Sequence, residues 1–534
     1  MPPEGDATVV PADATPEADC AYDVVDYPGH PRPQTHPDVL AAIARLHGLP
    51  AASPRCCRYL EVGCGDGANL LPLALAYPDS SFIGVDLSHK AIARGEQLRM
   101  QLGLDNLLLQ VADLGSWEPG PVPFDFVAAH GFYSWVPEAV RDALMRLCRE
   151  HLAAAGVAYV SYNAMPGCHI RRMIAQMLRA QVQGIEAPEL KLTQAIAMLK
   201  FLDAGVIGDT PYAQLVRHEV ASLVERTDPA VVFHDDLSDV NHAVSITEFA
   251  AHAGAFELAF LGEADYFEMS EEAAPPAVVG MLKAMAAADV LRKEQYLDFL
   301  KGRRFRQTLL CRRSQPLQRE VDPRLVLGLH VVGQVESRAE VDLALGAPVS
   351  FRAPQEAAFS VDHPVPKAAM QLLGERWPAP IAVDELLEQA QVRCMGIERS
   401  DAVADVEALA RTLLLGFRLG VLSLLCDPPQ VAAEVGSRPC TSALVRAQVA
   451  QVQALLTSVR GAVVDIPEPA ARELLGLLDG SRDRSALLLD VGARLAVGVD
   501  NLSAGSDPTQ RAACLELRLE EALLGFRRLG LLKA

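Results

Sequence analysis

The sequence lacks the features that would place it in several large classes of protein. None of its eleven cysteines forms a C-x-x-C pair, which argues against a zinc or thioredoxin-type site and suits a reducing compartment. The first residues show no basic segment followed by an apolar one, so no secretory signal is expected. The longest apolar stretch, 413–425, contains Arg418 and is too short to span a bilayer. We therefore expect a cytoplasmic protein with no membrane segment and no bound metal.

Aromatic residues and positive charge are also scarce. Aromatics make up only 5% of the chain, so its cores must be built mostly from Ala, Leu and Val. Against 68 acidic residues stand 48 Lys and Arg, giving a net charge of −20. Nucleic acid requires a basic face, so we expect no nucleic-acid partner. Such a charge would attract a basic protein substrate, although acidic chains are also common in the bacterial cytosol. A chain of 534 residues is long enough for about three packed units.

What the sequence does contain is a glycine-rich turn, Glu61-Val62-Gly63-Cys64-Gly65-Asp66-Gly67, between an apolar segment at 58–60 and a helical pattern at 69–76. Glycines at alternate positions let a backbone turn press against a ligand that a Cβ would exclude. Strand, glycine turn and helix form the first unit of a nucleotide-binding sheet. With Ala68 the turn also fits the looser dinucleotide pattern, and a turn without a ligand is a further alternative. The acid before the glycines favours S-adenosylmethionine, whose methionine end carries an ammonium and a sulfonium.

Four more buried strands follow this turn. Their apolar segments lie at 81–85, 107–111, 124–130 and 156–163. Helical stretches are expected between them, so the connections are right-handed crossovers and the sheet is parallel.

Ligands of parallel sheets bind beyond the carboxyl ends of the strands. In this sequence those ends carry Gly63, Asp86, Asp113, His130 and Asn163. Asp86 is placed to accept hydrogen bonds from both ribose hydroxyls, and Asp113 from the adenine amine. A single acid after a strand is often only a helix cap, but acids at successive strand ends favour a cofactor site.

The glycine turn, with Gly84-Val85-Asp86-Leu87-Ser88 and Ala112-Asp113-Leu114, resembles the motifs of class I S-adenosylmethionine-dependent methyltransferases. Further segments resemble bacterial methyltransferases with a methyltransferase regulatory domain, of which the rickettsial protein lysine methyltransferases that modify outer-membrane proteins are the best understood. The resemblance runs from about residue 22 and weakens past 320. The segments are Tyr27–Pro31, Gln34–Pro37, His130–Pro137, Ser161–Gly167, Phe260–Asp265, Glu294–Phe299 and Arg304–Leu310.

The resemblance implies S-adenosyl-L-methionine as the cofactor and a protein lysine as the acceptor. It also implies a protein partner, such as an outer-membrane or surface protein before export. The residues implied to bind the cofactor are Glu61, Gly63, Gly65, Gly67, Asp86, Leu87, Asp113, Leu114 and His130.

Candidate catalytic residues follow the fourth and fifth strands. Tyr133, Trp135, Tyr162 and Asn163 are expected to flank the methyl position, and His130 is the candidate base. An aromatic-lined apolar pocket would lower the pKa of an acceptor lysine. The alternatives are loop anchors for Tyr133 and Trp135, a structural role for His130, and a turn residue for Asn163.

Two further segments, one near the N-terminus and one at 234–236, carry residues with possible roles at the site. The proline-rich residues 22–37 would fold over the cofactor site, with a simple entry loop as the alternative, and Pro37 opens a helix to Leu46. The run His234-Asp235-Asp236 is more typical of a solvated loop or helix cap than of a substrate contact.

The expected fold is α/β: a Rossmann-like class I methyltransferase sheet with a helical cap insertion, plus a C-terminal, mainly α, winged-helix-like domain. The cap includes a largely helical stretch at 173–202, and strands at 255–260 and 306–311 close the sheet. The expected divisions are a disordered tail at 1–20, the cofactor-binding domain at 22–165, the cap or regulatory region at 166–315, a connector at 316–358 and tandem winged-helix-like units at 359–534.

The tandem prediction comes from two similar leucine-rich segments. Leu414-Leu415-Gly416-Phe417-Arg418 and Leu523-Leu524-Gly525-Phe526-Arg527 each end an expected helix just before a short strand. Winged helices often bind DNA, but no basic cluster marks a recognition helix here, so substrate docking or formation of a homodimer fits better.

Three functions remain open from the sequence. The first is transfer of a methyl group to a protein lysine amine. The second is small-molecule O- or N-methylation, which the large accessory domains disfavour. The third is a regulatory protein that binds the cofactor without transferring its methyl group.

Overall fold

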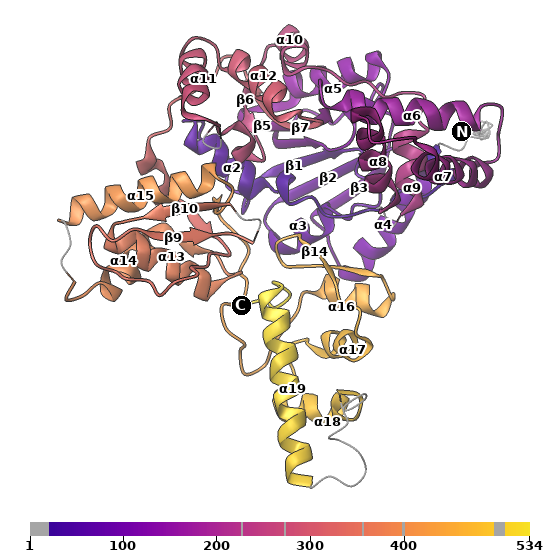
Figure 1. Ribbon diagram of the computed structural model, residues 1–534. Helices are drawn as coiled ribbons and strands as arrows, with labels where there is room; N and C mark the ends of the chain where they lie inside the picture. Colours follow the sequence, from indigo (N-terminus) through magenta and orange to yellow (C-terminus); the bar gives the residue numbers. More distant parts are fainter. Residues whose placement is uncertain (1–20, 226–227, 272–273, 355–356, 398–400, 496–507) are drawn as a thin grey trace, which may run out of the picture.

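The computed structural model describes residues 21–225, 228–271, 274–354, 357–397, 401–495 and 508–534. The expected disordered tail at 1–20 lies outside the described residues. Figure 1 shows a large α/β part that holds the central sheet, with two smaller C-terminal parts beneath it. Within the described ranges, no helix is both long and apolar enough to cross a membrane.

A seven-stranded mixed sheet, in the order β3-β2-β1-β4-β5-β7-β6, forms the centre of the α/β part. Strands β1 to β5 pair in parallel, whereas β7 runs antiparallel to both β5 and β6. The closing pair expected from the sequence is therefore present, shifted by a few residues at its ends. The strands are β1 Arg58–Val62, β2 Ser81–Asp86, β3 Leu107–Val111, β4 Phe124–Ala129, β5 Leu152–Asn163, β6 Leu258–Glu263 and β7 Phe305–Arg312.

Helices α3 (Leu70–Ala76), α4 (His89–Leu102) and α5 (Glu138–His151) connect the parallel strands. Ser88 caps α4 by accepting from the backbone N–H of Ala91. The helix expected between β3 and β4 is absent among these described residues, where 112–123 runs through turns. Three prolines between 119 and 123 explain this, because proline cannot donate the backbone hydrogen bond that a helix interior needs.

Local signals place two further helices as the sequence predicts. Helix α2 (Pro37–Leu46) begins at its proline, and His36 Nδ1 accepts from the backbone N–H of Asp38. Helix α10 (Ile246–Ala255) begins with a reciprocal capping box between Ser245 and Glu248.

The helical insertion packs around its own small core beside the sheet (Figure 1). The largely helical stretch expected at 173–202 is two helices that turn at Gly184, which has a φ of 80°. The insertion consists of α6 Cys168–Val182, α7 Pro188–Gly205, α8 Pro211–Val224, α9 Pro229–Val231 and the π-helical turn η3 Val232–Asp236. Between β6 and β7 lie η4 Tyr266–Met269, α11 Pro276–Ala288 and α12 Val290–Lys301.

The first C-terminal unit contains a three-stranded antiparallel sheet in the order β11-β8-β12. Its central strand lies within 316–358, so the prediction that this segment is only a connector was wrong. Strand β8 has three residues, too few for a recognisable alternation of polar and apolar side chains. The elements are η5 Pro323–Gly328, β8 His330–Val332, β9 Val349–Arg352, β10 Ala358–Val361, α13 Pro364–Arg376, β11 Ile381–Ala382, α14 Val383–Arg393, α15 Ala402–Arg418 and β12 Ser423–Leu425.

The second C-terminal unit has a separate hydrophobic core. Its last helix and α15 end alike, because Gly420 and Gly530 both adopt the left-handed conformation, with φ of 71° and 68°. This equivalence matches the repeat seen in the sequence. The elements are α16 Ala443–Ala450, β13 Leu455–Thr457, β14 Val463–Asp465, α17 Pro469–Leu477, α18 Arg484–Leu495 and α19 Pro508–Arg528.

Candidate active site

A cavity of about 660 Å³ opens at the carboxyl ends of the parallel strands. Its walls come from the glycine turn, the ends of β2, β4 and β5, the N-terminal segment and the helical insertion. The predicted site residues that line it are Glu61, Gly63, Gly65, Asp86, Leu87, Asp113, Leu114, His130, Trp135 and Asn163.

The glycine turn needs all three glycines, but for different reasons. Gly63, Gly65 and Gly67 have φ of 74°, 55° and 72°, in the region that side chains disfavour. Gly63 and Gly65 line the cavity, whereas Gly67 does not. A Cβ on Gly67 would lie 3.0 Å from the side chain of Leu109, so this glycine allows close packing of the turn against β3. Gly67 thus has a packing role, and its contact with the cofactor stays a prediction.

Asp86 holds the turn in place from the end of β2. Its Oδ2 accepts from the backbone N–H of Gly65 at 2.8 Å, and its Oδ1 accepts from that of Ser88 at 2.9 Å. Burial raises the pKa of its carboxyl, while these hydrogen bonds oppose that shift. Asp113 also makes a local hydrogen bond: its Oδ1 accepts from the backbone N–H of Gly115 at 2.9 Å. Asp86 and Asp113 thus each accept a hydrogen bond from a backbone N–H just after their strand, as a helix cap would, and each also lines the cavity.

Glu61 carries a polar atom without a partner. Its side chain is buried, and Oε1 accepts from Asn69 Nδ2 at 3.0 Å. Within the part of the chain that the structure describes, Oε2 has no hydrogen-bond partner. Burial raises the pKa of Glu61 to about 8, which reflects the cost of placing its charge there. An unpaired carboxylate oxygen on this wall suits a ligand with a positive group, such as the ammonium of S-adenosylmethionine.

A chain of hydrogen bonds determines which ring nitrogen of His130 carries the proton. Gln307 Nε2 donates to Asp265, and the Tyr159 hydroxyl donates to Gln307 Oε1 at 2.7 Å. The same hydroxyl lies 2.8 Å from His130 Nδ1, so Nδ1 must be the protonated nitrogen and Nε2 the acceptor. Burial, assisted by the charge of Arg32, lowers the pKa of His130 to about 3. So weak a base cannot hold a proton taken from an amine, which argues against the predicted role as catalytic base.

Tyr133 and Tyr162 do not line the cavity, contrary to the prediction. The hydroxyl of Tyr133 lies 2.8 Å from His252 Nδ1, and the ring of Tyr162 stacks on Phe249 with 4.1 Å between centroids. Tyr162 and Asn163 are neighbours on β5, so their side chains point to opposite faces of the sheet. Asn163 is the one on the cavity wall, and its Nδ2 donates to Asn241 Oδ1 at 3.0 Å.

The N-terminal segment folds over the cofactor side of the cavity. We call residues 22–35 the strap; Tyr22, Tyr27, His30 and Arg32 from it line the cavity. His234 Nε2 lies 2.7 Å from the carbonyl oxygen of Val25, and the imidazole ring of His234 stacks on the ring of Tyr22. The proline-rich sequence indicated this covering position. The run His234-Asp235-Asp236, expected to be a solvated loop or helix cap, instead contacts the strap through His234 and pairs with Arg171 through the two aspartates.

The helical insertion supplies site residues that sequence reasoning missed. Arg171, Glu219 and Asp235 line the cavity from the insertion, and Arg304 and Phe305 line it from the start of β7. Arg304 forms a two-point ion pair with Glu219, which is 85 residues away in the chain. Nothing in the local pattern around either residue indicates the other.

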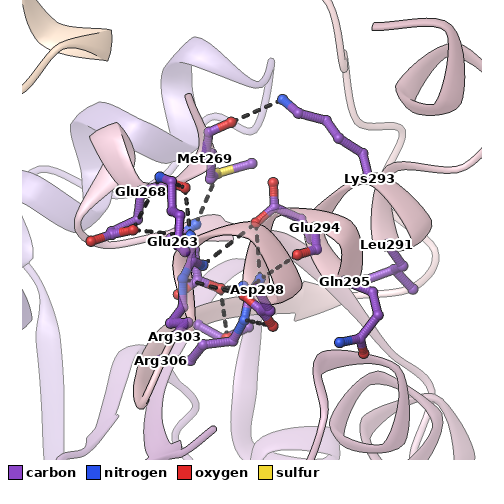
Figure 2. Close-up of polar contacts among 12 residues, drawn as sticks. Glu263, Glu268, Met269, Leu291, Lys293, Glu294, Gln295, Asp298, Arg303 and Arg306 are labelled. Atoms are coloured by element: carbon purple, nitrogen blue, oxygen red, sulfur yellow. Dashed lines mark hydrogen bonds and ion pairs between the residues drawn. The ribbon is translucent and has the colours of Figure 1, made fainter. Parts of the chain in front are cut away.

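The Glu294–Phe299 and Arg304–Leu310 motifs build a buried ionic cluster (Figure 2). Arg306 is 1% exposed and pairs with Glu263 at 2.5 Å, with Asp298 at 2.8 Å and with Glu294 at 3.1 Å. Thr308 donates to the same Glu263 at 2.8 Å and lies 3.1 Å from the hydroxyl of Tyr162. The cluster ties α12 to the β6–β7 pair and to β5.

Comparison with known proteins places this geometry in a family. Residues 60–156 match the family described as "Methyltransferase domain", and 228–312 match "Predicted methyltransferase regulatory domain". Residues 437–531 match "PKMT, C-terminal winged helix domain". Protein RP789 of Rickettsia prowazekii, described as uncharacterized, is 31% identical over 70% of this chain and 68% of its own length.

The chain belongs to the class I S-adenosylmethionine-dependent methyltransferases. The methyltransferase is also 31% identical to RP028 of the same organism, over 44% of this chain and 93% of that protein. The structure of PKMT2 from Rickettsia typhi in complex with AdoHcy superposes with a TM-score of 0.82 and 26% identity. The match covers 95% of this chain and 99% of that one. The methyltransferase therefore has S-adenosylmethionine as its cofactor, consistent with the fit of Glu61 and Asp86.

Proposed function

We propose that this methyltransferase transfers a methyl group from S-adenosylmethionine to the side-chain amine of a protein lysine. The observation that carries the proposal is the extent of the likeness to PKMT2, which includes the insertion and both C-terminal units. PKMT designates a protein lysine methyltransferase, and the winged-helix match at 437–531 bears the same designation. A likeness confined to the cofactor domain would have left the acceptor open.

The residues beyond the cofactor's expected place also suit an amine. Phe132, Trp135 and Phe305 line the cavity and give this part an aromatic wall. A lysine placed there loses hydration, which lowers its pKa and favours the neutral nucleophile. Because Nδ2 of Asn163 is engaged by Asn241, its Oδ1 is the atom left to accept from the amine.

The reaction then depends on alignment. The bound cofactor supplies a methyl group that is already activated by its sulfonium, so the protein mainly holds the amine in line with it. Correct placement can contribute roughly 7–11 kcal/mol toward the barrier. His130, neutral near pH 7 and fixed through Tyr159, would help orient groups in the cavity without removing a proton.

The proposal is tested by incubating the purified protein and radiolabelled S-adenosylmethionine with a lysate of its source organism. Label in protein, stable to base and released as methyllysine by acid hydrolysis, supports the proposal. The Asp86→Ala variant should label less at a cofactor concentration near the wild-type Kd, because its affinity for the cofactor is lower. Label confined to small molecules would instead support small-molecule methylation. Confirmed cofactor binding without any transfer would favour a regulatory role.

A further inference from the structure

A second cavity, of about 240 Å³, lies where the two C-terminal units meet the cofactor domain. Helix α2, the η4 turn, strand β12 and the loop between β13 and β14 each contribute residues to its wall. Among the described residues, none lines both this cavity and the cofactor cavity. Its volume equals that of about eight water molecules in the liquid, so it has room for a small organic molecule. We call it the junction cavity.

Arg460 enters the junction cavity from the loop between β13 and β14, which is closed by its own hydrogen bonds. The backbone N–H of Ser458 donates to the carbonyl oxygen of Ala462 at 2.8 Å, and Ser458 Oγ accepts from the backbone N–H of Ala462 at 2.9 Å. The backbone N–H of Val459 donates to the carbonyl oxygen of Gly530 at 2.9 Å, which attaches the loop to the chain just after α19. The side chain of Arg460 therefore starts from a fixed place.

The guanidinium of Arg460 has capacity for a ligand. The side chain is half-buried, and in the described ranges no carboxylate or carbonyl accepts a hydrogen bond from it. Burial lowers the pKa of Arg460, while the charge of Asp38 opposes that shift. Other half-buried arginines of the same unit differ, because Arg446, Arg472 and Arg527 each donate to a backbone carbonyl. Taking a cation out of water without an acceptor costs stability, so its retention on a cavity wall points to an anionic ligand.

His36 adds a second donor to the same wall. It is 8% exposed, and its Nδ1 accepts from the backbone N–H of Asp38 at 3.3 Å. Burial, assisted by the charge of Arg460, lowers the pKa of His36 to about 3, so the ring is neutral. A neutral ring whose Nδ1 accepts carries its proton on Nε2, and this N–H has no acceptor among the described residues.

The two carboxyl groups on the wall already have hydrogen-bond donors. Asp38 Oδ1 accepts from the two backbone N–H groups that follow β12, and Asp265 Oδ2 accepts from Gln307 Nε2 at 2.6 Å. Burial also raises the pKa of Asp38 to about 7, so near pH 7 about half of the molecules carry no charge there. These acids therefore repel an anion only weakly, whereas the guanidinium of Arg460 remains without an acceptor.

We propose that the junction cavity binds a small organic anion, a carboxylate or a phosphate monoester, with its charged group on Arg460 and His36. A guanidinium gives two parallel hydrogen bonds to either group, and His36 Nε2 donates a third. The organic part of the ligand contacts the apolar wall, which includes Val39, Phe417, Leu422 and Leu424. Because such a ligand touches α2, β12 and the β13–β14 loop together, it holds both C-terminal units against the cofactor domain.

Calorimetric titrations with benzoate, phenyl phosphate and inorganic phosphate test this site independently of the methyl acceptor. They are run at constant ionic strength with saturating S-adenosylhomocysteine, which keeps the anions out of the cofactor cavity. Wild type should bind benzoate or phenyl phosphate at one site per chain, and more tightly than inorganic phosphate, which has no apolar part. Tighter binding of benzoate would identify a carboxylate ligand, and tighter binding of phenyl phosphate a phosphate monoester.

Arg460→Met should weaken this binding at least about tenfold, and Arg460→Lys, which keeps the charge but loses the two-point geometry, should lie between. Ser423→Tyr, on the exposed wall position of β12, should block the cavity while Arg460 stays in place. Arg438→Met is the matched control, because it removes an exposed arginine of the same unit outside the cavity, and its affinity should stay within about twofold of wild type.

Titration with S-adenosylhomocysteine shows that each variant is folded, and its affinity should match wild type because neither Arg460 nor Ser423 lines the cofactor cavity. Unchanged anion binding in Arg460→Met and Ser423→Tyr would overturn the proposal. So would the absence of saturable binding of all three probes to wild type up to about 20 mM.

Discussion

The carboxylate of Asp38 accepts a hydrogen bond from the backbone N–H of Cys426, 388 residues further along the chain, at 2.6 Å. The same Oδ1 accepts from the backbone N–H of Asp427, also at 2.6 Å. Asp38 is 1% exposed in the first turn of α2, and Cys426 follows β12. This side chain is therefore one of the contacts that attach the first C-terminal unit to the cofactor domain, together with the hydrogen bonds of Ser53 and Tyr77 to Asp427.

We predict that Asp38→Ala destabilises the protein by about 2–4 kcal/mol, because it leaves two buried backbone donors without an acceptor. Urea denaturation followed by fluorescence gives the change in unfolding free energy. Asp322→Ala, which removes an exposed cap of η5, is the control and should cost no more than about 1 kcal/mol. Equal stability of Asp38→Ala and wild type would mean that other contacts hold the two parts together.

Asp86→Ala should weaken cofactor binding by about 1–3 kcal/mol through unpaired ribose hydroxyls. The loss also includes the brace on Gly65, because Asp86 Oδ2 accepts from that backbone N–H. Titration with S-adenosylhomocysteine measures the change. Asp79→Ala, in an exposed turn before β2, should bind like wild type. An unchanged affinity in Asp86→Ala would contradict the placement of the ribose at the end of β2.

Tyr162→Phe and Asn163→Ala should separate two neighbours on β5. Tyr162 faces away from the cavity, so removing its hydroxyl should leave the transfer rate within about twofold and cost about 1 kcal/mol of stability. Asn163→Ala should slow transfer at least about tenfold while cofactor affinity stays nearly constant. Single-turnover rates with the protein acceptor and S-adenosylhomocysteine titrations measure both quantities. A parallel loss of rate and affinity in Asn163→Ala would assign Asn163 a structural role.

Arg306→Met should be among the most destabilising single changes in the regulatory region. It leaves Glu263 buried without its cation and takes one of two arginines from Glu294 and Asp298, which keep their ion pairs with Arg303. Breaking a buried ion pair from one side costs about 3–5 kcal/mol. Arg324→Met removes an exposed ion pair with Glu407 and should cost less than about 1 kcal/mol. Thermal unfolding of both variants tests the contrast. Similar midpoints for the two would show that the cluster contributes little.

Features encoded by neighbouring residues could be predicted from the sequence. The glycine turn, the start of α2 at Pro37 and the capping box at Ser245 each depend on a few consecutive positions. The sheet followed because a short apolar segment recurs several times, with a glycine, an acid, a histidine or an asparagine at its end. The alternation of side chains along a strand indicates that Tyr162 and Asn163 point to opposite faces of the sheet, but it does not say which of the two lines the cavity.

Other parts of the site depend on contacts that local patterns do not encode. The pairing of Arg304 with Glu219 and the hydrogen bond of His234 to Val25 join segments 85 and 209 residues apart. The weak basicity of His130 comes from burial, which a linear sequence does not state. Strand β8 is too short for a periodic signal and is defined only by its two partners.

The raised pKa of Glu61 makes cofactor binding depend on pH. Burial raises this pKa to about 8; Asp86 and Asp66 add to the rise, while Asn69 and Arg32 oppose it. Near pH 7 the free protein therefore holds a proton on Glu61, whereas an ammonium ligand favours the carboxylate. Binding of S-adenosylhomocysteine should release up to one proton, and its affinity should rise with pH between about 6 and 8.

Titrations in buffers with different ionisation enthalpies measure this proton release, which Glu61→Gln should abolish. The stability of the ligand-free protein depends on pH in the opposite direction from the cofactor affinity. Because the folded-state pKa of Glu61 lies above its ordinary value of 4.5, the protein loses stability as the pH rises from 4.5 to about 8. Glu61→Gln should therefore stabilise the ligand-free protein more at about pH 9 than at about pH 5. Proton release that persists in Glu61→Gln would assign the titration to another group, and equal stabilisation at both pH values would contradict the raised pKa.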